Sequence, residues 1–166
     1  MARRSPARTR ALRGLTRFGS TAAVCTAVAG TVIGLRAYRG AGPRPVPALP
    51  ILLLGIGLRR VCLAASRRQR PAVDDWLYPA TGYSFPSGHS TNAAMAAVLI
   101  GTAARDAELP AWPAVAAAGG CYAVAVGGSR VYLGMHWPSD VLAGWALGLG
   151  WTYTARRYFL QQRRRK

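Results

Sequence analysis

Acidic side chains are scarce in this sequence: its 166 residues include five Asp and Glu but 22 Lys and Arg, for a net charge of +17. So basic a balance ordinarily indicates a nucleic-acid-binding protein. Charged residues nevertheless make up only 16% of the chain, whereas 51% of the residues are hydrophobic. The low charge content argues against a soluble basic protein, and the long apolar runs between the charges argue against intrinsic disorder. The composition therefore favours a membrane protein.

Cysteine and histidine are also rare. The three cysteines, Cys25, Cys62 and Cys121, are an odd number within apolar stretches and lack the close Cys/His spacing of a zinc site. Their placement argues against a disulfide framework and against bound zinc, and we interpret them as small apolar residues on helix surfaces. The two histidines, His89 and His136, lie instead among polar and turn-forming residues at the edges of apolar runs. This position marks them as candidate functional residues.

Five apolar runs follow a basic N-terminal segment, 1–18. A helix that crosses a hydrocarbon core of about 30 Å needs about 20 residues. The run lengths therefore predict an all-α, integral-membrane helical bundle of about five transmembrane helices, with a membrane domain over 19–158 and a basic tail over 159–166. The expected spans are 19–35, 48–66, 87–104, 112–128 and 139–158.

Local signals add detail to this arrangement. Residues 36–47, rich in Pro, Gly and Arg, are expected to form a hinge, and 67–85 an ordered loop. Ser87 is expected to cap the helix that it opens, because a serine oxygen can accept hydrogen bonds from free N–H groups. Glycines four residues apart permit close helix contact in the first and the last span. These glycines are Gly30, Gly34, Gly144 and Gly148.

Two polar runs flank the third and fourth spans. The first is Phe85-Pro86-Ser87-Gly88-His89-Ser90, and the second extends from Ser129 to Asp140. Because an out-and-back pair of helices connects the two runs, we expect both on one membrane face, together with Arg70. That face would combine arginines, imidazoles, a carboxylate and the N–H groups of a turn that opens a helix. Such a set suits a phosphate group.

The same residues could carry out phosphoryl transfer. One imidazole could attack phosphorus while the other protonates the leaving oxygen. Asp140, four residues after His136, could hold its Nδ1–H as the carboxylate does in a catalytic triad. Because Pro138-Ser139-Asp140 opens a span, Asp140 could also serve as a helix N-cap.

The runs Pro86-Ser87-Gly88-His89 and Ser129-Arg130-x5-His136-x3-Asp140 resemble the second and third signature motifs of the type 2 phosphatidic acid phosphatase superfamily. These are membrane lipid-phosphate phosphatases related in fold to vanadium haloperoxidases. The resemblance implies that His136 is the nucleophile that forms a phosphohistidine, that His89 is the general acid, and that Asp140 orients His136. It also implies that no metal or cofactor takes part. The phosphoryl group would be bound by Arg70, Ser87, Gly88 and Arg130.

The chain departs from the family pattern in its first motif. The family usually has a Lys seven residues before the arginine of Arg70-Pro71, and this chain has Leu63 there. Arg60 or Arg67, each about one turn from Leu63 if the region is helical, could reach the same phosphate. Arg67 and Arg68 are otherwise expected to be surface charges near lipid headgroups. Many family members also have six spans, whereas five are expected here.

The sequence thus predicts a multi-pass protein of the cell membrane that hydrolyses a lipid phosphate or diphosphate of polyprenyl or glycerolipid type. The alternative is a catalytically silent membrane protein that binds lipid phosphates, with the missing lysine as its sign. The terminal arginine clusters are expected to contact headgroups and not nucleic acid. Positive residues divide almost evenly between the two faces, so the positive-inside rule does not orient the site. The resemblance favours the outer face.

Overall fold

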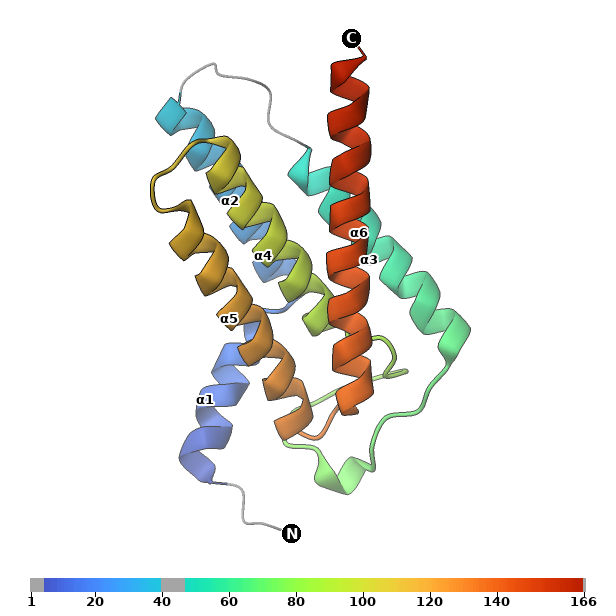
Figure 1. The fold of residues 1–166 in the computed structure, drawn as a ribbon. Helices are drawn as coiled ribbons and strands as arrows, with labels where there is room; N and C mark the ends of the chain where they lie inside the picture. The colour runs from blue at the N-terminus through green and yellow to red at the C-terminus, as the bar shows by residue number, and fades with distance from the viewer. Residues whose placement is uncertain (1–4, 40–46, 166) are drawn as a thin grey trace.

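The computed structural model describes residues 5–39 and 47–165, and these residues form a helical bundle that contains no strand (Figure 1). The five long helices run alternately up and down, and the short first helix lies beside the lower part of α5. The elements are α1 (Pro6–Arg17), α2 (Thr21–Arg39), α3 (Ala48–Ser66), η1 (Val73–Asp75, a 3-10 turn), α4 (Gly88–Asp106), α5 (Trp112–Tyr132) and α6 (Pro138–Arg164).

Each of the five expected spans coincides with a helix, so the all-helical prediction is confirmed for the described residues. Helix α3 has the expected bounds, whereas α6 continues as one helix as far as Arg164, into the segment expected to be a tail. The expected hinge overlaps the end of α2, and its residues 40–46 lie outside the described part of the chain. Helix α1 was not predicted, because its arginine-rich sequence carries no apolar run.

Within the described residues, three helices are long and apolar enough to cross a membrane: α2 over Thr21–Tyr38, α3 and α5. The expected count of five is therefore not confirmed by hydropathy. Helix α4 has a lower hydropathy because its first turns are polar, yet Ser90, Thr91 and Asn92 are buried. This helix packs against α2, α3, α5 and α6, so its polar side chains face other helices.

Small residues bring α6 close to α4 at the end of the bundle where α6 begins. A Cβ added to Gly144 would lie 2.8 Å from the Ser87 carbonyl oxygen, and one added to Gly148 would lie 2.7 Å from that of Thr91. The close contact expected for this glycine pair is confirmed. The pair on α2, Gly30 and Gly34, has open space at both positions.

The apolar core lies between α2, α3, α4 and α6 and contains Val24, Val28, Ile51, Leu52 and Met95. The three cysteines are free, as their odd number and spacing predicted. Cys25 and Cys62 are half-buried on helices, and Cys121 is exposed on α5. The core thus joins α4 to α6, and a second apolar cluster of Ala93, Ala123 and Val126 joins α4 to α5.

Candidate active site

The polar runs expected on one membrane face meet at one end of the bundle, where α5 ends and α4 and α6 begin (Figure 1). The loop over 67–87 crosses the same end. A hydrogen bond from the Ser87 N–H to the Asp140 carbonyl oxygen, 3.0 Å long, joins the starts of α4 and α6. The out-and-back topology predicted from the sequence therefore brings both motifs together.

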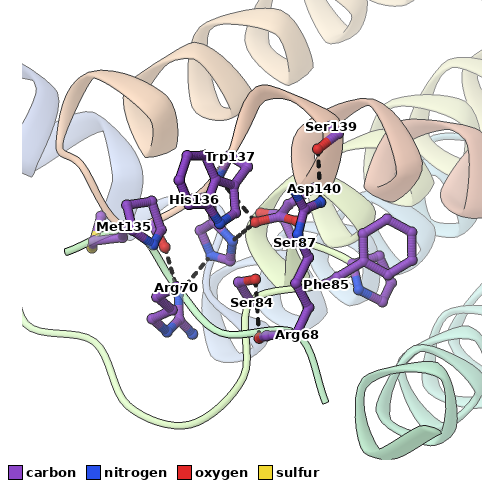
Figure 2. Close-up of polar contacts among 12 residues, drawn as sticks. Arg68, Arg70, Ser84, Phe85, Ser87, Met135, His136, Trp137, Ser139 and Asp140 are labelled. Carbon is purple, nitrogen blue, oxygen red and sulfur yellow. Dashed lines mark hydrogen bonds and ion pairs between the residues drawn. The ribbon is translucent and has the colours of Figure 1, made fainter. Parts of the chain in front are cut away.

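His136 is held between an arginine and a carboxylate (Figure 2). Its Nε2 lies 3.1 Å from Arg70 Nη1, and its Nδ1 lies 3.4 Å from Asp140 Oδ2. A carboxylate accepts a hydrogen bond and a guanidinium donates one, so both neighbours favour the tautomer with the proton on Nδ1. The Nε2 lone pair then points toward Arg70, and His136 retains only 3% of its exposure.

The surroundings of His136 keep the ring neutral. Burial lowers the pKa of His136 to about 4, and the positive charges of Arg130 and Arg70 act in the same direction. The hydrogen bond and the negative charge of Asp140 oppose this shift. At neutral pH the imidazole therefore keeps a lone pair that can act as a nucleophile.

Asp140 is fully buried and accepts three hydrogen bonds or ion pairs (Figure 2). Its Oδ2 accepts the Trp137 backbone N–H at 2.9 Å as well as the contact from His136, and its Oδ1 lies 3.0 Å from Arg68 Nη1. The N-cap of α6 is Trp137, so Asp140 occupies the third helical position and closes the first turn from there. Asp140 therefore both stabilises the start of the helix and contacts His136, although it is not the N-cap residue.

Arg68 has a role that sequence reasoning missed. The side chain was expected at the surface near headgroups, but its Nη1 contacts Asp140 and also donates to Ser139 Oγ at 2.7 Å. Its guanidinium carbon lies 5.7 Å from the ring centre of Trp137. Arg68 thus holds the carboxylate that in turn holds His136, while remaining 39% exposed itself.

Arg70 uses all five of its N–H groups. Its Nε donates to the Gly82 carbonyl, and its Nη2 donates to the carbonyls of Thr81 and Tyr83. Its Nη1 donates to the Met135 carbonyl and faces His136. All five distances lie within 2.9–3.1 Å. Four of the five acceptors are backbone carbonyls. The loop before α4 therefore fixes the direction of this guanidinium.

Arg130 is almost entirely buried, with 4% exposure, near the end of α5. Its Nη1 donates to Thr16 Oγ1 on α1 at 3.0 Å, whereas its Nε has no hydrogen-bond partner. A buried donor without an acceptor is costly. The Nε is therefore a group that an anion at this site could satisfy.

The start of α4 supplies the second histidine and a set of backbone N–H groups. Ser87 has an extended backbone at the N-cap position, but its side chain makes no capping bond and instead accepts a hydrogen bond from Ser90 Oγ at 3.0 Å. The expected serine cap is therefore wrong, because Ser90 competes for the oxygen. Gly88 and His89 form the first turn and are half-buried. A Cβ on Gly19 would lie 3.1 Å from His89, so the chain before α2 packs on this histidine.

The arginine that lies against the start of α4 is neither of the two that were expected to compensate for Leu63. Arg60 and Arg67 are both exposed. Arg59 is instead half-buried, its Nε donates to the Pro86 carbonyl at 3.0 Å, and its guanidinium lies against Gly88. The adjacent arginines at 59 and 60 were visible in the sequence, but the direction in which each points was not.

No group of three or more His, Cys, Asp or Glu side chains in the described part of the chain is placed to hold a metal ion. Arg59, Arg68, Arg70 and Arg130 bring positive charge to this end, where Asp140 is bound to three partners. Chemically, the arrangement offers a neutral imidazole with an oriented lone pair beside cations and helix-start N–H groups. It suits an anionic, oxygen-rich group such as a phosphate.

Comparison with known families gives a match that covers most of the chain. The PAP2 superfamily profile matches residues 24–164. An undecaprenyl-diphosphatase of Sulfolobus acidocaldarius is 46% identical over 70 residues, which are 41% of this chain and 30% of that protein. Phosphatidylglycerophosphatase B of Bacillus subtilis is 45% identical over 73 residues, 42% of this chain and 36% of that protein. The matches thus span about a third of the length of these relatives.

Two solved structures share the fold over most of their length. The PAP2-type phosphatidylglycerolphosphate phosphatase of Bacillus subtilis superposes with a TM-score of 0.79 at 30% identity, covering 95% of this chain and 79% of that one. LpxE of Aquifex aeolicus gives a TM-score of 0.69 at 23% identity, covering 93% and 88%. The second likeness concerns the fold alone.

Proposed function

The chain belongs to the PAP2 superfamily, and we propose that it is a membrane phosphatase that hydrolyses a lipid phosphate or diphosphate through a phosphohistidine at His136. The observation that carries the proposal is the position of His136 between Arg70 and Asp140. The carboxylate holds the Nδ1–H, and the arginine faces the nitrogen that would attack. A phosphorus atom that reached Nε2 would therefore bring its oxygens to the Arg70 guanidinium.

In the proposed first step, the Arg70 Nη1–H moves from Nε2 of His136 to a phosphoryl oxygen. The freed Nε2 lone pair attacks phosphorus, and the bond from phosphorus to the leaving oxygen breaks. His89 donates a proton to that oxygen. The leaving group is the lipid alcohol when the substrate is a lipid phosphate, and the lipid monophosphate when it is a lipid diphosphate. Asp140 stabilises the imidazole as it becomes positive. In the second step, a water oxygen attacks phosphorus and gives a proton to His89, the bond from phosphorus to Nε2 breaks, and inorganic phosphate leaves, which restores His136.

The phosphoryl oxygens would be bound by cations and N–H groups from separate elements. Arg130 offers its unpartnered Nε, and Arg70 offers the Nη1 N–H that faces His136. The N–H groups of Ser87 and Gly88 lie at the start of α4, where the helix dipole also favours an anion; that of Ser87 would have to exchange its bond to Asp140. Arginines and N–H groups would thus do what metal ions do in other phosphatases, so we expect no metal requirement.

The proposal extends to the membrane. Helices α4 and α6 alternate in direction with the three apolar helices in one bundle. A helix of 19 residues such as α4 is about as long as a hydrocarbon core is thick. We therefore propose five spans in the cell membrane, which would put α1 and the site on one side and the end of α6 on the other. Labelling of Asp74→Cys and Gln161→Cys from outside intact cells, each in a chain whose own three cysteines are changed to Ser, would test this. Labelling of both from one side would exclude five spans.

The substrate class is proposed from the relatives, which are an undecaprenyl-diphosphatase and phosphatidylglycerol-phosphate phosphatases. The test is phosphate release by the detergent-purified protein from undecaprenyl diphosphate, phosphatidylglycerol phosphate and phosphatidate, with and without EDTA. We expect release from at least one lipid, unchanged by EDTA and inhibited by vanadate, which can become five-coordinate beside a histidine. Activity that is lost on chelation and restored by magnesium would contradict this mechanism. Binding without release would support the silent alternative, which the complete set of histidines and acid disfavours.

A further inference from the structure

A third guanidinium lies at the candidate active site, close to the place that the family pattern gives to a lysine. That lysine position is Leu63, and Arg59 precedes it by four residues on α3. Residues four apart share one face of a helix, and a helical side chain covers the turn before its own Cα. A side chain at position 63 therefore covers the surface beside Arg59. Both positions face the same part of the site.

Two contacts place Arg59 against the start of α4. Its Nε donates to the Pro86 carbonyl oxygen at 3.0 Å. A Cβ built on Gly88 would lie 3.0 Å from the Arg59 guanidinium carbon and 3.3 Å from Nη1. The guanidinium thus lies beside the turn whose N–H groups are proposed to bind phosphate. A larger residue than glycine at position 88 would displace it.

The donors of Arg59 that remain free distinguish it from Arg70. The bond to Pro86 uses Nε, and neither Nη1 nor Nη2 has a hydrogen-bond partner among residues 5–39 and 47–165. Every N–H of Arg70 has an acceptor. An entering phosphate could therefore take the terminal N–H groups of Arg59 without breaking an existing bond, whereas Arg70 would have to exchange one.

The positive charge of Arg59 also has no counterion among the described residues. The side chain is half-buried, forms no ion pair with a carboxylate of the described residues, and experiences the like charges of Arg70 and Arg60. It also acts electrostatically on His89 and Arg130 across the site. Bringing cations together away from water is unfavourable unless an anion joins them. The arrangement is favourable once a phosphate is bound.

From these contacts we infer that Arg59 binds a phosphoryl oxygen of the substrate and replaces the missing first-motif lysine. The inference rests on the proposed function and specifies which cation completes its phosphate site. A guanidinium can donate two parallel hydrogen bonds to phosphate oxygens, whereas an ammonium acts as a point charge. In this chain the cation is relocated by one helical turn, so Leu63 is not a sign of catalytic silence.

The test moves the cation back to the family position. Four forms of the full chain are compared with wild type: Arg59→Gln, Leu63→Lys, the double variant Arg59→Gln/Leu63→Lys, and Arg60→Gln as the neighbouring exposed control. Each is measured for kcat/KM on the lipid phosphate that wild type hydrolyses fastest. Each is also measured for the rise in Tm that inorganic phosphate produces, which reports binding without chemistry. Size-exclusion chromatography in detergent checks folding.

Arg59→Gln should lower kcat/KM by about 10- to 100-fold, the effect of losing a charge-assisted hydrogen bond, and should reduce the phosphate-dependent rise in Tm. Leu63→Lys in the double variant should recover most of both losses, and Arg60→Gln should match wild type. A purely structural role for Arg59 would not be rescued from position 63. If Arg59→Gln does not fold, Arg59→Lys is compared with Arg60→Lys, and only the former should lose activity.

The outcomes separate this inference from the proposed function. If wild type hydrolyses lipid phosphates but Arg59→Gln behaves as Arg60→Gln does in both measurements, Arg59 is not a phosphate ligand. Failure of Leu63→Lys to restore either quantity would also overturn the inference. If wild type releases no phosphate from any lipid, yet inorganic phosphate raises Tm through Arg59, the inference stands and the phosphatase proposal fails. If phosphate is neither released nor bound, both are wrong.

Discussion

Arg59 and Arg130 at one end of the bundle differ from Arg105 and Arg156 at the other end in what they contact. At the end remote from the histidines, Arg156 Nη2 donates to both carboxylate oxygens of Asp106, at 2.7 and 2.9 Å, and both side chains keep contact with solvent. Arg105 there lies over the ring of Trp112. At the histidine end, Arg59 and Arg130 are partly or wholly buried and pair with no carboxylate among the described residues.

This difference indicates that the buried arginines serve ligand binding and not stability. An exposed ion pair adds little to stability, and its loss is tolerated. Buried cations without counterions reduce the stability of the fold, so their presence at one end calls for an anionic ligand there. The comparison predicts that substitutions at the histidine end change catalysis strongly, whereas substitutions at the remote end change almost nothing.

The largest effect is expected from His136→Ala. Without the imidazole no phosphohistidine can form, so turnover should fall to background for every substrate, a loss on the order of 10⁴-fold or more. Phosphate release from the best lipid substrate measures this, and thermal unfolding in detergent confirms that the variant folds. Near-normal turnover by this variant would overturn the assignment of the nucleophile.

A smaller and substrate-dependent effect is expected from His89→Ala. Loss of a general acid should slow hydrolysis of an alkyl phosphate by about 10²- to 10⁴-fold. Nitrophenyl phosphate, whose leaving group needs little protonation, should lose much less. The measurement is the ratio of the two rates in each histidine variant. Equal losses on both substrates would argue against a separate role for His89.

The next effect concerns pH. Because burial lowers the pKa of His136 to about 4, Nε2 is protonated below that pH and free above it. The value of kcat/KM should therefore fall as the pH drops through about 4. Asp140 raises the pKa of His136, so Asp140→Asn should move this acidic limb to lower pH while also reducing the rate. An acidic limb that stays in place in Asp140→Asn would show that another group titrates.

The smallest effect is expected at the remote end. Asp106→Asn should leave kcat/KM unchanged and should cost less than about 1 kcal/mol of stability, because the ion pair is partly exposed. Thermal unfolding and phosphate release in the same detergent measure both quantities. A large loss of activity would break the contrast between the two ends and would require a coupling along α6.

The sequence predicted those parts of the molecule that depend on run length and connection. Five apolar runs became α2 to α6 because helices of that length are what apolar runs of this kind form. His89 and His136 lie at the same end of the bundle because α4 and α5 form one hairpin between them. Topology alone therefore predicted most of the candidate site.

The parts that the sequence did not predict depend on contacts between distant residues. Helix α1 has no apolar run, and two contacts with distant residues set its place. Arg13 donates to the Leu77 carbonyl at 2.6 Å, and Thr16 accepts a hydrogen bond from Arg130, 114 positions away. Arg59 and Arg60 are neighbours that point about 100° apart around α3. Which of them faces α4 is decided by the packing of Ile51 and Leu52 in the core, which no local pattern reveals.

The five occupied donors of Arg70 have a consequence for how the surrounding loop can vary. Because Thr81, Gly82 and Tyr83 hold the guanidinium through main-chain carbonyls, the site constrains the path of the loop and leaves the identity of most side chains open. Gly82 is the exception, since its φ of +65° disfavours other residues. Relatives could therefore remodel the side chains that this loop presents to a lipid headgroup and keep the arginine in place. The range of lipid headgroups accepted can therefore change while the residues that bind and transfer the phosphoryl group stay the same.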